Sequence, residues 1–488
     1  MFRVNRNSIL RWIAFSFILL QGVLIFSNLF IMSDTINHIM FIMNYVIGFF
    51  IIADLIVDGI AQHLLAISFF GCFMLFLMAQ KPFKPDYDVF LTFAWTKLDT
   101  SQYVTFSSIL FCGLAVTYLS YLFFACRVTG IKKREVVNKR DYYQALRPLV
   151  LVLLILTFPC ALYMQAKVVL VRSGMSYTSG YLVNVDVPAV VKVGYYIYSG
   201  VILVFLVLKP TKKQLWIVLG TYLLVEGGLQ LLQGRRALFA STLLFSIWYL
   251  LKYYNIKKIS PKLLFRIGII AFGLVVLFFV VEQMRDEKGF VLSSNFIERF
   301  LVSTGGSDSV IANTIARKDK FPENGFKYLL DPISNNIIGN LILRKGSVAQ
   351  GLEYLELHNS FAHWLSYLTE SSLYLSGHGM GSCYLAEMYL AMGMVGVFLI
   401  SIVLGLVLHI LDINIFHLRF YQAVLVLFFI RRVFTLPRDG LLSWIGNLIY
   451  LLCVFALLLP FYYIYNTINK DYARDEDMIK DQSYGTTT

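Results

Sequence analysis

Apolar runs long enough to cross a bilayer recur along the whole of this 488-residue chain. A membrane-spanning helix needs ~18–20 mostly apolar residues, and the first run, Ile9–Met32, exceeds that length. Hydrophobic residues make up 58% of the chain and charged residues 15%, whereas a soluble domain carries ~25% charged residues. Hydrocarbon offers no water to backbone groups, so a chain that crosses it repeatedly is helical there. We therefore predict an all-α, polytopic integral membrane protein.

The apolar runs divide into about twelve transmembrane helices. We expect a single membrane domain over residues 1–465, with one long extracytoplasmic loop, about 284–382, between the ninth and tenth spans. Residues 466–488 are polar and are predicted to form a disordered cytoplasmic tail. The spans are predicted at 9–31, 38–57, 62–79, 104–126, 148–170, 189–208, 215–232, 237–252, 265–283, 384–410, 418–436 and 441–464.

The distribution of lysine and arginine sets the orientation of these spans. Basic clusters occupy the connections at 127–147, 209–213 and 252–266, and short basic connections stay in the cytoplasm. With both termini in the cytoplasm, all three connections fall on the cytoplasmic side. The net charge of +13 then reflects this retention and not nucleic-acid binding.

Several arginines break this pattern, because they lie at helix ends that are predicted to face the exterior. The planar guanidinium group binds phosphate oxygens in a bidentate manner, which lysine does not do. Several such side chains at one depth suit a diphosphate, although any one of them can instead snorkel to lipid headgroups. Gly234 precedes one pair and permits close approach of the backbone. These arginines are Arg235, Arg236, Arg285, Arg431, Arg432 and Arg438.

Three carboxylates accompany the arginines. Glu226 lies inside the seventh span, where a carboxylate is either a structural partner or part of a functional site. Asp439 directly follows Arg438 and can pair with it. Glu387 begins the tenth span, where the helix dipole favours a negative charge.

The long loop adds two histidines and one amphipathic segment. His358 and His378 are candidates for proton transfer, although a loop histidine is more often structural. His358 and His363 are five residues apart and so do not share the helix face that zinc needs. We expect no metal and no cofactor. The apolar spacing in 361–368, FAHWLSYL, predicts a helix that lies on the membrane surface or closes over a cavity.

Three stretches share the same predicted side: GRRA at 234–237, PRDGL at 437–441, and the glycine-rich segment that leads from 358 into the apolar run ending at 399. In content and order they resemble the Wzy-type oligosaccharide repeat-unit polymerases, which polymerise O-antigen and capsular polysaccharide. Residue by residue, the resemblance falls on Gly234, Arg236, Ala237, Arg438, Asp439, Gly440, Gly377, Gly379, Gly381, Ser382 and Glu387, with a looser match at Arg285.

This resemblance implies a GT-C-like, metal-independent glycosyltransferase that joins undecaprenyl-diphosphate-linked oligosaccharides outside the membrane. Arg236 and Arg438 would stabilise the leaving diphosphate, with Arg285 or Arg235 assisting. The base would be Glu387, Asp439 or His358, and the choice among them stays open. Membrane lipid and the chain-length regulator and flippase of the same pathway are the expected partners. The further residues expected to contact substrate are Gly234, Glu226, His378, Arg431 and Arg432.

Two alternative functions remain open at this point. A polysaccharide ligase transfers the finished chain to another acceptor, and such ligases carry an outer-loop histidine to which His358 corresponds. A flippase or transporter of lipid-linked sugars would place charges along its spans to line a path. Because Glu226 is the only charge that the sequence places deep in a span, transport is disfavoured.

Overall fold

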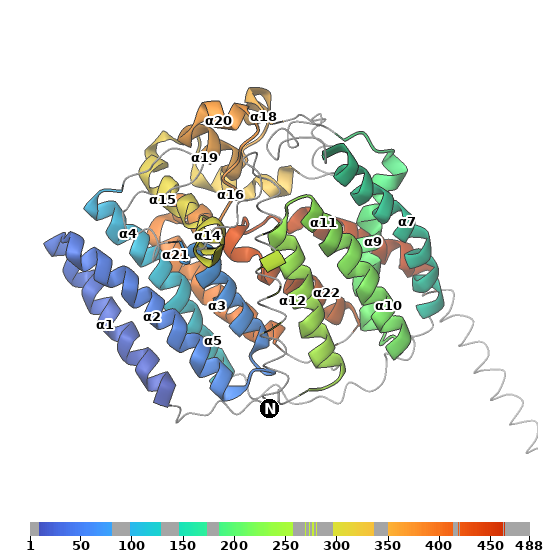
Figure 1. Ribbon diagram of the computed structural model, residues 1–488, viewed down its shortest axis with the longest axis horizontal. Coiled ribbons are helices and arrows are strands. Elements are labelled where there is room, and N and C mark those ends of the chain that lie inside the picture. The colour runs from blue at the N-terminus through green and yellow to red at the C-terminus, as the bar shows by residue number, and fades with distance from the viewer. Residues whose placement is uncertain are drawn as a thin grey trace, which may run out of the picture.

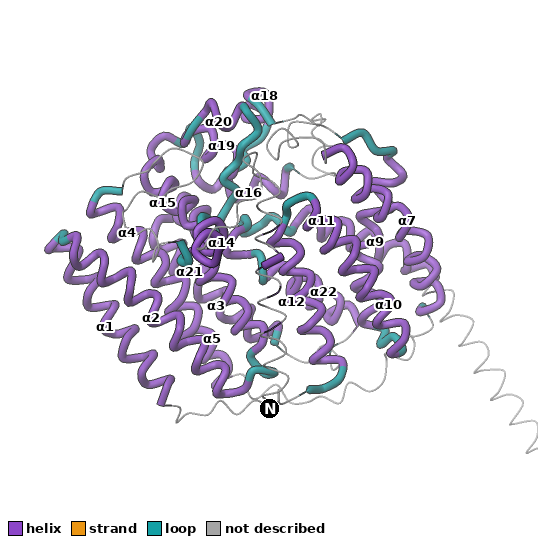
Figure 2. The backbone as a smooth tube through the Cα atoms, in the orientation of Figure 1, coloured by secondary structure: helices purple, strands orange, loops and turns teal. Residues whose placement is uncertain are grey.

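Helices are the regular elements throughout the described part of the chain (Figures 1 and 2), which confirms the all-α prediction. The computed structural model describes residues 9–80, 98–127, 146–172, 185–256, 296–335, 350–412 and 420–461, with single positions at 269, 273, 276, 277, 280, 418 and 463. The predicted span 265–283 (beyond those single positions) and the predicted tail 466–488 lie outside the described residues, as does Arg285.

Every other predicted span coincides with a helix. Among the described residues, seven helices are long and apolar enough to cross a membrane. These are α1 (Ile9–Ile31), α2 (Asp34–Gly59), α4–η1–α5 (Thr100–Phe111, Cys112–Val116 and Thr117–Arg127), α7 (Arg147–Arg172), α9 (Ala189–Val207), α10–η3–α11 (Lys212–Tyr222, Leu223–Gly228 and Leu229–Leu232) and α21 (Tyr384–Leu411). Shorter helices at the remaining predicted spans are α3 (Leu64–Leu77), α12 (Arg236–Tyr253), α22 (Phe420–Val433) and Ile445–Phe461.

The membrane helices form two groups that meet at α3. Figure 1 shows α1, α2, α4, α5 and α21 on one side and α7, α9, α10, α12 and α22 on the other. α3 packs against α2 and α21 from the first group and against α12 and α22 from the second. Its buried phenylalanines, among them Phe69, Phe70 and Phe73, join both groups in one apolar core. This arrangement places the last turn of α3 between the helix ends that carry the arginines.

The described parts of the long loop form a helical cap at one end of the bundle (Figure 1). The helix predicted at 361–368 is present as α19. Its apolar residues Phe361 and Leu365 are 2% and 0% exposed, so this helix closes on the protein and not on lipid. The cap helices are α14 (Phe296–Gly305), α15 (Asp308–Arg317), η4 (Lys318–Lys320), α16 (Gly325–Ser334), α18 (Leu352–Leu357), α19 (Phe361–Thr369) and α20 (Ser371–Leu375).

A buried ion pair corrects the prediction that Glu226 is the only charge inside a span. Asp54 lies in the predicted span 38–57 and is 0% exposed. Its Oδ2 accepts hydrogen bonds from Arg11 Nη2 at 2.9 Å and from the Tyr118 hydroxyl at 2.7 Å. The three side chains come from α1, α2 and α5, so the pair ties these helices together.

The polar contacts continue from this pair to Asp412, which directly follows the last residue of α21. Arg11 also contacts Asp58, 3.3 Å from Nη2 to Oδ2, and His63 Nε2 lies 3.2 Å from the same oxygen. His63 Nδ1 is 2.6 Å from the Tyr121 hydroxyl, which donates to Asp412 Oδ2 at 3.1 Å. Charges in an apolar bundle are tolerated in this way because each has a partner.

Replacing Asp54 by alanine should strongly destabilise the bundle, because Arg11 keeps its charge and loses its main partner. Breaking a buried pair in this way typically costs about 3–5 kcal/mol. Thermal unfolding of the purified protein in detergent measures the effect. Asp34, an exposed residue in the first turn of the same helix, provides the control as Asp34→Ala. Equal melting temperatures for the two variants would contradict the structural role of the pair.

Candidate active site

Gly234 ends α11 and turns the chain into α12. Its φ of +79° is in the left-handed region, where glycine carries no steric penalty. The Gly234 N–H donates to Leu231 O at 2.8 Å, and the Arg235 N–H donates to Gln230 O at 3.0 Å. These two bonds make a Schellman motif. The glycine therefore has a backbone role, and it sets Arg236 as the first residue of α12.

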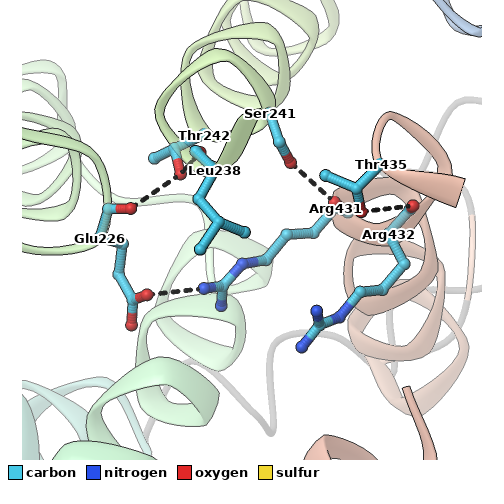
Figure 3. A pocket seen from close by; sticks show the side chains of 7 residues that line it. All are labelled: Glu226, Leu238, Ser241, Thr242, Arg431, Arg432 and Thr435. Carbon is cyan, nitrogen blue, oxygen red and sulfur yellow. Dashed lines mark hydrogen bonds and ion pairs between the residues drawn. The ribbon is translucent and has the colours of Figure 1, made fainter. Parts of the chain in front are cut away.

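Glu226 and Arg431 form an ion pair between η3 and α22. Arg431 Nη2 lies 2.9 Å from Glu226 Oε2 (Figure 3), and the carboxylate is 4% exposed. It also accepts hydrogen bonds from the hydroxyls of Ser199 and Tyr195. The sequence left the role of Glu226 open between a structural partner and a functional group. In the structure its carboxylate is a partner of Arg431.

Arg432 is placed differently from its neighbour. Its side chain lines a cavity of about 30 Å³ with Glu226, Leu238, Ser241, Thr242, Arg431 and Thr435. In Figure 3 its guanidinium group lies beside that of Arg431, and the ion pair with Glu226 is made by Arg431. Its Nε is buried without a hydrogen-bond partner among the described residues. A buried cationic donor in this state is expected to bind an anion or water.

The turn after α22 brings the acidic candidates together. Glu387, at the start of α21, is 6% exposed. Its Oε2 accepts the Leu441 N–H at 2.8 Å, and its Oε1 accepts the Ser382 hydroxyl at 2.6 Å. A Cβ atom at Gly440 would lie 2.6 Å from Oε1, so glycine is required for this approach. Asp439 precedes Gly440 and accepts the backbone N–H of that residue at 2.9 Å.

Both arginine-bearing turns lie against the end of α3. The short 3-10 turn η6 (Leu436–Arg438) and helix α12 each pack on α3. Arg438 is exposed, and its Cζ lies 5.9 Å from the centre of the Phe76 ring. Beside this position, Leu75 of α3 and Phe239 of α12 pack against the same small cluster of Leu231 and Phe300. The Arg236 and Arg438 turns, far apart in sequence, thus share one neighbour.

The two histidine candidates lie in the cap. His358 is 3% exposed, and its ring centre is 4.6 Å from that of Tyr354. His378 follows α20, and its Nδ1 lies 3.0 Å from the Ser376 hydroxyl. The structure therefore brings Glu387 against the turn Arg438–Gly440 and places both histidines in the cap.

The sequence reading did not include several residues that support this site. Ser199 and Tyr195 hold Glu226, and Asp331 of α16 accepts the Asn359 N–H beside His358 at 3.0 Å. Tyr195 and Ser199 are four residues apart in an otherwise apolar span, which is a polar stripe that the sequence displays. Asp331 carries no comparable signal, because its neighbours come from distant parts of the loop.

Comparison with protein families gives a match to O-antigen polysaccharide polymerase Wzy over residues 12–471, nearly the whole chain. The chain belongs to the Wzy family. Members of this family polymerise O-antigen repeat units, so the substrate is a lipid-linked oligosaccharide in a membrane. Comparisons with curated proteins and with solved structures give no match. The Wzy family match also agrees with the long apolar helices in indicating a multi-pass membrane protein.

Gly440→Ala should impair polymerisation without loss of the protein. The added methyl group would push the Glu387 carboxylate away from the Leu441 N–H, and a displacement of about 1 Å in an active site typically lowers the rate ~10²-fold. Gly220 of α10 provides the control, because it lies outside these motifs and a Cβ there meets nothing within 4 Å. Sizing of surface polysaccharide compares the two variants. Long chains from Gly440→Ala would show that the close approach has no role.

The stability of the cap should fall as the medium becomes acidic. Burial, and then the neighbouring His358, lower the pKa of His363 from 6.5 to about 4. The unfolded chain therefore binds more protons between these two values, and the folded state loses stability as the pH falls through that range. The melting temperature measured from pH 7 to pH 4 should decline less steeply in His363→Gln. Equal slopes for the wild type and His363→Gln would contradict this expectation.

Proposed function

We propose that this chain joins undecaprenyl-diphosphate-linked repeat units at the outer face of the bacterial cytoplasmic membrane, with both termini in the cytoplasm. The main support is the contact between Glu387 and the turn Arg438–Gly440. It sets a buried carboxylate beside an arginine-bearing turn at the end of the bundle that the cap covers. The described residues Lys212 and Lys252 lie at the ends of α10 and α12 that are farther from the Gly234 turn, which supports this orientation.

In the proposed reaction, a hydroxyl of the acceptor repeat unit attacks the anomeric carbon of the growing chain. The bond from that carbon to the diphosphate oxygen breaks, and the lipid diphosphate leaves with the bonding electron pair. The hydroxyl proton passes to a base. Arginines held in position before the reaction stabilise the charge that develops on the leaving group. On this proposal no metal ion is needed.

The arginines have different parts in this proposal. Arg236 and Arg438 bind the diphosphate, because each begins or ends a helix beside α3. Arg432 can add a further contact, since its Nε has no partner within the described residues. Arg431 is neutralised by Glu226 and positions its neighbours. Arg285 or Arg235 assists Arg236 and Arg438.

We assign the base to Glu387. Asp439 accepts the N–H of its own neighbour, Gly440, and His358 is buried against Tyr354 in the cap. Glu387 is the candidate that touches the arginine-bearing turn directly. Each of its oxygens receives one hydrogen bond, which leaves lone pairs for the hydroxyl proton.

Arg236→Ala and Arg438→Ala should each lower the rate of elongation by about 10²–10³-fold, the usual effect of removing one preorganised donor. The lysine variants should recover little activity, because lysine lacks the planar fork. Purified protein in vesicles, supplied with defined lipid-linked repeat units and a metal chelator, provides the assay. Product length is read on gels. Lys320→Ala, an exposed cation in the cap, is the control.

Two outcomes would contradict the proposal in different ways. Wild-type elongation by both alanine variants would show that these arginines only anchor helix ends at the lipid headgroups. Failure of the wild-type protein to elongate chains until a divalent metal is restored would instead overturn the metal-independent mechanism. The chain-length regulator and the flippase of the pathway are not needed in this assay, although both are proposed partners in the cell.

A further inference from the structure

Helix α16 of the cap has one buried face and one exposed apolar face. Gly325, Tyr328 and Asp331 lie on the buried side. On the opposite side Phe326, Leu330 and Ile333 are 44%, 48% and 50% exposed. Their spacing of four and three residues places them in one stripe along the helix. An apolar stripe on a short surface helix needs a partner other than water.

The position of α16 along α21 fixes its depth. A Cβ atom at Gly325 would lie 2.4 Å from the carbonyl oxygen of Leu390 and 2.6 Å from the Cα of Ala391, so the start of α16 rests directly on the backbone of α21. α21 has 28 residues, whereas ~20 suffice to cross the hydrocarbon core. A core-length segment counted back from Leu411 reaches Met392. The contact with α16 falls immediately beyond that point, where the core gives way to the headgroup region.

The backbone of α21 changes direction at the same level. Gly393 has φ +62° and ψ −150°, which is not a helical conformation. From Met392 onward, the section of α21 that spans the core carries exposed apolar side chains. Among them, Met392, Val395 and Leu399 are 40%, 62% and 45% exposed. Side chains of this kind on a membrane-spanning helix face lipid. The stripe of α16 therefore begins beside a surface that is already lipid-facing.

Charged residues flank the stripe on its polar side. Lys327 Nζ pairs with Glu323 Oε2 at 2.7 Å, and the two side chains are 56% and 41% exposed. A lysine beside an apolar stripe can reach the headgroups while its methylene stem stays on the apolar surface. A helix with this division between faces is typical of one that lies in the plane of a membrane interface.

We propose that α16 lies flat in the membrane interface, with Phe326, Leu330 and Ile333 inserted among the lipids of the leaflet nearest the cap. The partner is the bilayer itself. This contact seats the cap on the membrane, and the opposite face of the same helix carries Asp331, whose Oδ1 accepts the Asn359 N–H at 3.0 Å. The bilayer thereby helps to fix the segment around His358. The proposal does not depend on the assignment of the arginines or of the base.

Fluorescence quenching by brominated phospholipids tests this position. An environment-sensitive fluorescent amino acid is introduced at Leu330 in the full chain, reconstituted in vesicles of phosphatidylethanolamine and phosphatidylglycerol. The same reporter at Val395 marks a lipid-facing site, and at Ser372, an exposed position of α20, it marks the solvent side of the cap. Bromine placed close to the lipid carbonyls should quench the Leu330 reporter several-fold more than the Ser372 reporter. Bromine at mid-chain should quench Leu330 less than Val395.

A second pair of variants separates the lipid contact from folding. With the reporter at Ile333, Leu330→Asp should reduce quenching several-fold, and Ser372→Asp, on the solvent side of the cap, should leave it nearly unchanged. Quenching at Leu330 no greater than at Ser372 would overturn the proposal. Quenching at Leu330 that is weak at high protein density and rises when the protein is diluted in lipid would also overturn it. The stripe would then face a second copy of the chain. Elongation activity of each labelled protein confirms that it is folded.

Discussion

Backbone hydrogen bonding in hydrocarbon limits this chain more than any single side-chain contact. A membrane core offers no water, so every N–H and C=O group there must find a partner within the protein. Continuous helices satisfy this requirement, and most of the described bundle consists of them. The departures lie in two π-helices, Cys112–Val116 and Leu223–Gly228, and at Gly393. The first lies against α21, the second carries Glu226, and the third follows Glu387 in the same helix.

The same low-dielectric surroundings sort the arginines of the bundle into distinct roles. Arg11 is matched by Asp54, and Arg431 is matched by Glu226. Such pairs link helices, because separating the partners would leave a charge unbalanced in an apolar medium. Arg432 has no matching partner for its Nε within the described residues, and Arg438 is exposed. One residue type therefore serves both to bind helices together and to offer positive charge to a ligand.

The sequence predicts the helices well, because spans, caps and turns depend on local pattern. Gly234 could be assigned to a helix end from its place between two apolar runs, and its φ of +79° confirms this. Long-range pairing was beyond such reasoning. Glu226 and Arg431 are 205 residues apart, and they meet because α12 packs against both η3 and α22. The contact of Glu387 with Gly440 likewise depends on how two distant turns approach each other.

Two signals were present in the sequence and could have been used. Arg11 and Asp54 both interrupt apolar runs, which predicts a buried pair, and the apolar spacing of Phe326, Leu330 and Ile333 equals that of the segment at 361–368. The segment at 361–368 is predicted either to lie on the membrane surface or to close over a cavity. α19 is a helix, and tertiary contacts bury its apolar face. The exposed apolar face in the cap belongs to α16 instead. Exposure is set by packing, and a pattern of residues along one helix does not reveal which neighbour will cover it.

The break at Gly393 has a mechanical consequence. A continuous rod that tilts within a membrane swings both of its ends, and helices do tilt when bilayer thickness changes. A rod interrupted at the edge of the hydrocarbon transmits much less of that swing. The section from Tyr384 to Met392 can therefore keep Glu387 in register with Leu441 while the longer section leans to suit thinner or thicker lipid.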